Sequence, residues 1–229
     1  MPQSLSFGPI TIHFYGIFVG FGVLLSYLYC SKKSRYLGLN QKNIDYLFLI
    51  TLPFSLLGAR LYHIFSSWQY YQTNFPEMFN IQNGGLGIFG LLCGSFAGIT
   101  ISARLQKIRL FPCFNLVFPS FLLAQAIGRI GNFFNQEAMG PNNFPTFFLE
   151  SSLCLVAFIV FLIITKKKKL LNFGFAYYLI SYGLIRFFTE SLRNDTWTIN
   201  GIKLGWIFSV MMFVTGLVVL YFSHEDLGN

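Results

Sequence analysis

The 229-residue chain is strongly apolar: 54% of its residues are hydrophobic, 29 are Phe, only 10% are charged, and its mean hydropathy is +0.57. This composition excludes a soluble globular domain, which carries about 25% charged residues, and it indicates an integral membrane protein. The formal net charge of +8 does not indicate nucleic-acid binding, because the basic residues fall in short clusters between apolar runs and form no solvated stripe.

Seven apolar runs approach the roughly 20 residues that span a hydrocarbon core. They are predicted to be transmembrane helices at residues 10–30, 44–65, 86–103, 111–134, 147–165, 173–189 and 204–222. The sequence shows no repeat of 20 to 50 residues and no soluble segment between these runs, so residues 1–229 are predicted to form a single seven-helix transmembrane domain. No basic residue precedes the first run, and the run is long enough to remain an anchor, so no cleavable signal peptide is expected.

Clusters of basic residues predict the orientation of these helices. Eleven of the sixteen Lys and Arg residues follow the first, third and fifth runs, as Lys32, Lys33, Arg35 and Lys42, then Arg104, Lys107 and Arg109, then residues 166–169. Because Lys and Arg accumulate in cytoplasmic loops, the N-terminus is predicted to be external and the C-terminus cytoplasmic. The longest external segments, 66–82 and 191–203, contain Trp and Tyr residues and are predicted to lie at the headgroup level as short interfacial segments.

Polar features begin in the outer part of the first run. Tyr15, within His13-Phe14-Tyr15-Gly16, is by itself typical of an interfacial aromatic residue. Before the third helix, Gly84 and Gly85 offer backbone N–H groups of the kind that receive anions at helix N-termini. Within that helix, glycines repeat at the four-residue spacing of close helix packing; they are Gly90, Gly94 and Gly98.

Residues 128–140 read Gly-Arg-Ile-Gly-Asn-Phe-Phe-Asn-Gln-Glu-Ala-Met-Gly and end the fourth apolar run. They bring Arg129, Asn132, Asn135 and Glu137 to the predicted membrane surface. Arginine inside a membrane costs roughly 2.5 to 3.5 kcal/mol on insertion scales, so such a cluster indicates either snorkelling to the interface or a functional site.

Four arginines lie near the external ends of the even-numbered runs: Arg60, Arg129, Arg186 and Arg193. In the sixth run Tyr182, Arg186, Glu190 and Arg193 share one helix face by their spacing. A structural salt bridge through Glu190 explains part of this pattern. With Glu137 and Glu190 as the nearest carboxylates, however, positive charge remains in excess. Since guanidinium groups bind phosphate oxygens in a bidentate manner, the pattern predicts a phospholipid-headgroup site.

Metal and thiol chemistry are not expected. The four cysteines and three histidines are scattered, without the spacing of a metal site or a disulfide framework. No nucleophile elbow or phosphate-binding P-loop is present either. No metal or cofactor is therefore predicted.

Residues 128–140 resemble the signature of the prolipoprotein diacylglyceryl transferases, Gly-Arg-x-Gly-Asn-Phe-x-Asn-x-Glu-x-x-Gly, at every fixed position. The resemblance covers nearly the whole chain. It extends to His13-Phe14-Tyr15-Gly16, Gly58-Ala59-Arg60, Asn83-Gly84-Gly85, and Tyr182-Gly183-Leu184-Ile185-Arg186 with Glu190 and Arg193.

This resemblance implies a multi-pass enzyme of the bacterial inner membrane. Such an enzyme moves the sn-1,2-diacylglyceryl group from phosphatidylglycerol to the lipobox cysteine thiol of a preprolipoprotein, forming a thioether and releasing glycerol phosphate. Arg129, Arg186, Tyr15 and Glu137 are the expected catalytic residues. The headgroup would contact Arg129, Asn132, Asn135, Arg186, Glu190, Arg193, Arg60, Gly84 and Gly85, with Glu137 and Glu190 orienting the arginines.

The chain departs from the family pattern at two places. Phe89 occupies a position where other members carry His or Tyr, and Phe144-Pro145-Thr146-Phe147 stands where they have His-Pro-x-Gln. Phe89 can neither accept a proton nor donate a hydrogen bond. Two alternatives to the transferase therefore remain open: a diverged paralogue with another acceptor, and a non-catalytic phospholipid-binding membrane protein.

Overall fold

The computed structural model describes residues 4–7, 10–80, 85–135, 138–193 and 196–228. All seven apolar runs are helical in it: α1 (Phe14–Lys33), α2 (Gln41–Ser66), α4 (Ile88–Leu105), α5 (Leu110–Asn135), α6 (Thr146–Ile164), α7 (Gly174–Ser191) and α8 (Leu204–Gly228). Six helices of the described chain are long and apolar enough to cross a membrane, and α7 is not among them. Arg186, Glu190 and several tyrosines lower the hydropathy of α7. An all-α polytopic membrane protein is thus confirmed, while seven spans and their orientation stay predictions.

Shorter elements connect these helices. They are the strands β1 (Ser4–Phe7), β2 (Ile10–His13), β3 (Thr198–Ile199) and β4 (Ile202–Lys203), the helix α3 (Trp68–Tyr71), and the 3₁₀ helices Ser34–Leu37, Phe75–Phe79, Pro141–Asn143 and Lys168–Phe173. The first helix was expected from residue 10 but begins at Phe14. Residues Ile10–His13 instead pair antiparallel with β1, as their run of β-branched residues favours.

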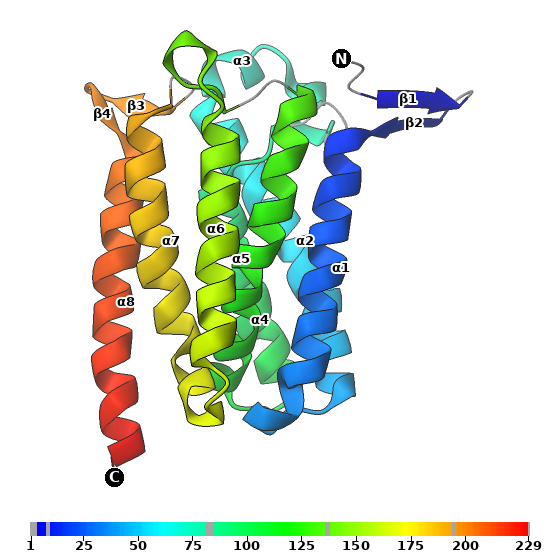
Figure 1. The fold of residues 1–229 in the computed structure, drawn as a ribbon. Helices are drawn as coiled ribbons and strands as arrows, with labels where there is room; N and C mark the ends of the chain where they lie inside the picture. The colour runs from blue at the N-terminus through cyan, green and yellow to red at the C-terminus, as the bar shows by residue number, and fades with distance from the viewer. Residues whose placement is uncertain (1–3, 8–9, 81–84, 136–137, 194–195, 229) are drawn as a thin grey trace. The chain divides into compact units, whose positions relative to one another are not determined.

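The chain forms two compact units. The first unit comprises Met1–Leu37 and Asn115–Asn229, and the second unit comprises Gly38–Phe114. In the first unit α7 packs between α6 and α8, and in the second unit α2 packs along α4 (Figure 1). A single domain over residues 1–229 stays a prediction.

Glycines bring α2 and α4 into close contact. A Cβ atom added to Gly90 would collide with the carbonyl oxygen of Gly58, and one added to Gly94 would collide with the carbonyl oxygen of Phe54. Gly98 faces Thr51 with 2.8 Å between a built Cβ and the Thr51 Cα atom. The packing interpretation of the four-residue glycine spacing is therefore confirmed, since only residues without a side chain permit this approach.

The first unit buries charges and exposes apolar side chains. Glu150, Arg186 and Glu190 are each at most 4% exposed. By contrast, large apolar residues of α8 are 45 to 58% exposed; they include Val210, Met211, Val214, Leu217 and Val218. In hydrocarbon, charged groups face the bundle interior and apolar groups face lipid, so this distribution suits a membrane-embedded bundle.

Candidate functional site

Four charged side chains form a continuous chain of ion pairs inside the first unit. Arg129 Nη2 lies 2.8 Å from Glu150 Oε1, and Arg186 Nη1 lies 3.1 Å from Glu150 Oε2. Arg186 Nη2 lies 2.5 Å from Glu190 Oε2. Arg186 thus bridges two carboxylates and Glu150 bridges two guanidiniums, an arrangement that the forked geometry of arginine makes possible.

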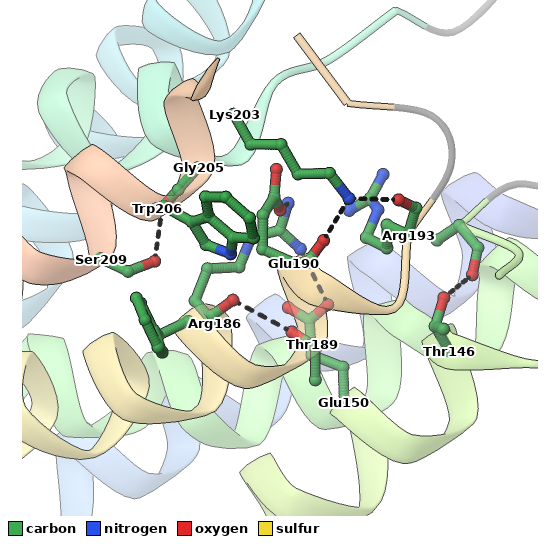
Figure 2. A network of polar contacts seen from close by, with 12 residues as sticks. Thr146, Glu150, Arg186, Thr189, Glu190, Arg193, Lys203, Gly205, Trp206 and Ser209 are labelled. Atoms are coloured by element: carbon green, nitrogen blue, oxygen red, sulfur yellow. Dashed lines mark hydrogen bonds and ion pairs between the residues drawn. The ribbon is translucent and has the colours of Figure 1, made fainter. Parts of the chain in front are cut away.

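Three helices bring this ion-pair chain to one level. Arg129 lies in the last two turns of α5, Glu150 in the first two turns of α6, and Arg186 in the last two turns of α7. Because consecutive helices α5 and α6 run in opposite directions, the end of one lies beside the start of the next. Figure 2 shows Glu150 of α6 facing Arg186 and Glu190 of α7.

Burial makes the ion-pair chain energetically demanding. The exposed fractions of the side chains are 13% for Arg129, 1% for Glu150, 5% for Arg186 and 2% for Glu190. Charges so far from water are tolerated only when they are paired and hydrogen-bonded. Each member therefore depends on its neighbours, and a ligand that entered would meet groups already held in position.

Tyrosines and a glutamine extend the cluster toward the middle of the helices. The Tyr182 hydroxyl donates to Glu150 Oε1 over 3.0 Å, and the Tyr182 ring stacks on Tyr178 with centroids 5.6 Å apart. Gln125 Nε2 donates in turn to the Tyr178 hydroxyl over 2.9 Å. Glu150 thus accepts hydrogen bonds from two arginines and a tyrosine, which fixes both of its oxygens.

The fourth side of the cluster is built by β4 and the start of α8. Lys203 Nζ donates to the carbonyl oxygens of Glu190, over 2.9 Å, and Arg193, over 2.7 Å (Figure 2). Both carbonyls lie at or just beyond the C-terminal end of α7, where cations are favoured. A Cβ atom on Gly205 would collide with the Glu190 carboxyl group, so the absence of a side chain at position 205 allows the Glu190 carboxylate to pack against α8.

The signature segment contributes packing as well as charge. A Cβ atom added to Gly131 would lie 2.9 Å from Cδ2 of Tyr15, so the Tyr15 ring rests on the backbone of α5. Tyr15 is also an electrostatic neighbour of Arg129. A Cβ atom on Gly140 would collide with the carbonyl oxygen of Leu192. These glycines therefore allow α1 and the end of α7 to approach the segment closely.

The remaining predicted residues lie in different places. Asn132 is 6% exposed and sits one helical turn beyond Arg129, and Asn135 ends α5. Arg193 is an electrostatic neighbour of Glu150. Arg60 and Gly85 belong to the second unit, whereas Glu137 and Gly84 lie outside the described residues.

Glu150 was missed by the sequence reasoning. The sequence predicts Glu137 and Glu190 as the carboxylates nearest the arginines, but Glu150 bonds both Arg129 and Arg186, so that prediction is corrected. The signal was available: Glu150 is a lone acid near the start of an apolar run, and an ionisable residue inside a membrane indicates a functional site by default. Among the residues that the structure describes, no three His, Cys, Asp or Glu side chains gather as for a metal ion.

Known proteins resemble this chain over nearly its whole length. The family model for prolipoprotein diacylglyceryl transferase matches residues 2–222. A phosphatidylglycerol–prolipoprotein diacylglyceryl transferase of Clostridium novyi (strain NT) is 32% identical, with 97% of this chain and 96% of the relative covered. Proteins of the same description from Limosilactobacillus reuteri (strain DSM 20016) and Staphylococcus haemolyticus (strain JCSC1435) are 30% and 32% identical. The alignments cover 96% and 97% of this chain, and 90% and 88% of the relatives.

Proposed function

The chain belongs to the prolipoprotein diacylglyceryl transferase family, and we propose that it transfers the sn-1,2-diacylglyceryl group of phosphatidylglycerol to the lipobox cysteine thiol of a preprolipoprotein. In this reaction the cysteine sulfur attacks the carbon of the diacylglyceryl group that bears the phosphate. The bond between this carbon and the phosphate oxygen breaks, a thioether forms, and glycerol phosphate leaves. The thiol must lose its proton, since only the thiolate is nucleophilic.

The ion-pair chain of the first unit is the observation that carries this proposal. Arg129 and Arg186 are buried, oriented by Glu150, and able to bind phosphate oxygens. The phosphate changes from a diester with one negative charge to a departing monoester with two. Cations aimed at this developing charge stabilise the transition state more than the ground state, which is the condition for catalysis.

Other residues are assigned supporting roles in the proposal. Asn132 and Asn135 bind phosphate or glycerol oxygens, and Tyr15 positions the thiol or the glycerol beside Arg129. Glu190, Glu150 and Glu137 orient the arginines. Arg193 is a further headgroup contact of the proposal, and the contacts expected from the resemblance at Arg60, Gly84 and Gly85 stay predictions.

The proposal places the protein in the bacterial inner membrane with seven spans, an external N-terminus and a cytoplasmic C-terminus. The six long apolar helices support a multi-pass membrane location. In this orientation the ion-pair chain faces the external leaflet, where the lipobox cysteine of an exported precursor is found. Phosphatidylglycerol and the precursor's signal peptide are then the partners, and no nucleic acid is involved.

Purified protein incubated with headgroup-labelled phosphatidylglycerol and a lipobox peptide tests the proposal. We expect one glycerol phosphate released for each peptide modified, and loss of both products in Arg129→Ala and Arg186→Ala. Arg109→Ala, in a predicted cytoplasmic cluster, serves as the matched control and should retain activity. Wild-type turnover by either of the first two variants would contradict the assignment of the arginines.

The same assay separates the alternatives. Glycerol phosphate released without peptide modification would indicate another acceptor, and lipid binding without release would indicate a non-catalytic protein. It also settles whether the reaction needs a polar group at position 89. Phe89 is 5% exposed here and its ring centroid lies 6.0 Å from that of Tyr62, so in this chain it is a packing residue.

A further inference from the structure

A polar pocket lies in the second unit, at the end of α2 and the segment that follows it. Its volume is about 190 Å³. Six polar or aromatic side chains line it: Arg60, His63, Tyr70, Tyr71, Glu77 and Asn80. All belong to residues 38–114, so the pocket is a feature of this unit by itself.

Arg60 builds the wall of the pocket through backbone contacts. Its guanidinium donates to the carbonyl oxygens of Met78, over 3.0 Å, and Gly85, over 3.2 Å. It also donates to the carbonyl oxygens of Glu77, over 2.5 Å, and Asn80, over 2.9 Å. Since arginine has five N–H donors, these four bonds use most of its capacity. Arg60 therefore fastens the backbone of Glu77, Met78, Asn80 and Gly85 to α2, and a bidentate phosphate clamp is not its geometry.

The groups that remain for a ligand favour hydroxyls over an anion. Glu77 offers a carboxylate, which only accepts hydrogen bonds; its Oε2 lies 3.4 Å from Asn80 Nδ2. His63 and Tyr70 add imidazole nitrogens and a hydroxyl, which can donate or accept. A carboxylate repels phosphate but accepts well from hydroxyl groups. The pocket thus matches a neutral polyol in chemistry.

Size narrows the ligand further. At about 30 Å³ for each water-sized group, a volume of about 190 Å³ holds roughly six such groups. A glyceryl group has three carbons and three oxygens and fills this space, whereas drug-sized ligands need about 300 Å³ or more. Tyr71 is 5% exposed and its ring lies 5.4 Å from Arg60 Cζ, so it gives the glyceryl carbons an apolar wall.

We propose that this pocket binds the glyceryl group of a phosphoglycerol headgroup, with Glu77 accepting hydrogen bonds from its hydroxyls. The inference deepens the proposed function, since phosphatidylglycerol is the donor there. Two sources share this chemistry: the intact lipid headgroup and the glycerol phosphate released from it. The phosphate itself would lie outside the pocket.

The test compares two lipids that differ only in the hydroxyls. Phosphatidylpropanol keeps the phosphate and a three-carbon headgroup but lacks both headgroup hydroxyls. Binding of each lipid to the full-length protein in detergent micelles is measured by native mass spectrometry. We expect wild type to prefer phosphatidylglycerol about tenfold, because each lost hydrogen bond weakens binding several-fold. Glu77→Gln should reduce this preference to about twofold.

Controls keep the test decisive. Asp45→Asn changes an exposed acid near the other end of α2, where it accepts from Gln41, and it should leave the lipid preference unchanged. Because the preference is a ratio measured on one protein, a loss of overall affinity or yield does not affect it. An unchanged ratio in Glu77→Gln, or no preference in wild type, would overturn the proposal.

A competition arm distinguishes the two sources. If free glycerol phosphate displaces phosphatidylglycerol from wild type but not from Glu77→Gln, the pocket accepts the released product too; if it displaces neither, the lipid headgroup is the ligand. Both outcomes require the lipid preference and so support the pocket. Lipid binding is measured without any acceptor peptide, so it tests the pocket alone. Failure of the proposed function would appear separately, as absence of peptide modification in the activity assay.

Discussion

Replacing Glu150 by Gln isolates the central link of the ion-pair chain. Glutamine keeps the size and one acceptor oxygen of the side chain but removes the charge. Its amide nitrogen would face a guanidinium, because the two carboxylate oxygens bond Arg129 on one side and Arg186 on the other. The variant therefore removes the carboxylate that Arg129 pairs with in the described cluster and leaves Arg186 paired with Glu190.

The cost follows from burial. Breaking a buried ion pair by removing one partner typically destabilises a protein by about 3 to 5 kcal/mol. Here the side chains of Glu150 and Arg186 are 1% and 5% exposed, so solvent screens little of the effect. We expect the free energy of unfolding to fall by about 3 to 5 kcal/mol. Misplaced guanidiniums should also lower kcat by roughly 10² to 10³, the loss typical of one oriented transition-state donor.

Stability is measured by SDS-induced unfolding in mixed micelles followed by circular dichroism, and activity by release of labelled glycerol phosphate. Adding Arg129→Gln to Glu150→Gln removes one stranded cation, so the double variant should be at least as stable as the single one. Strict additivity of the two losses would refute the reasoning, because members of one buried network are expected to couple by 0.5 to 3 kcal/mol. Asp45→Asn is the exposed control.

Three further predictions concern the same cluster. Arg186→Lys should lower kcat at least about 100-fold in the labelled-lipid assay, because a single ammonium cannot bridge two carboxylates as the guanidinium fork does. Gly205→Ala should destabilise by about 1 to 3 kcal/mol in SDS unfolding through overpacking against Glu190. Gly20→Ala, with no atom within 4 Å of the new Cβ, should not; equal effects would contradict the packing argument. Tyr15→Phe keeps the ring packing and should lower kcat with less than about 0.5 kcal/mol change in stability, whereas unchanged kcat would remove its hydroxyl from the mechanism.

The helices were predictable because crossing a membrane imposes a simple length and composition. The ends of the helices were less predictable where strand pairing competed with helix formation. Residues Ile10–His13 are apolar enough to extend the first helix but form a hairpin strand. In α7 a different conflict appears. Its polar residues serve the cluster, and the same residues take it below the hydropathy of the six candidate spans. The residues that form the buried ion pairs thus weaken the pattern by which a span is recognised.

The site was predictable only in part, for a related reason. Arg129 and Arg186 stood out because arginine is costly in an apolar run. The residue spacing in α7 also predicted that Glu190 lies beside Arg186, and the ion pair between them confirms this. Pairing between α5 and α6 or between α6 and α7 depends on tertiary contacts that helical spacing does not encode. Glu150 was therefore overlooked, although it joins both arginines, and so was Gly205, whose role exists only because Glu190 lies against it.

The charges of the cluster bear on why such an expensive arrangement suits phosphate chemistry. Arg129, Arg186, Arg193 and Lys203 face two carboxylates, Glu150 and Glu190, so the described part of the cluster carries two positive charges in excess. A phosphodiester compensates one of them, and the departing phosphate monoester compensates both. At an effective dielectric of about 20, one unit charge 4 Å from another contributes about 4 kcal/mol. The attraction therefore grows by several kcal/mol as the carbon–oxygen bond breaks. Arg129 and Arg186 with Glu150 and Glu190 alone would be neutral and would lack this gain, so in the proposed reaction the excess charge links lipid binding to turnover.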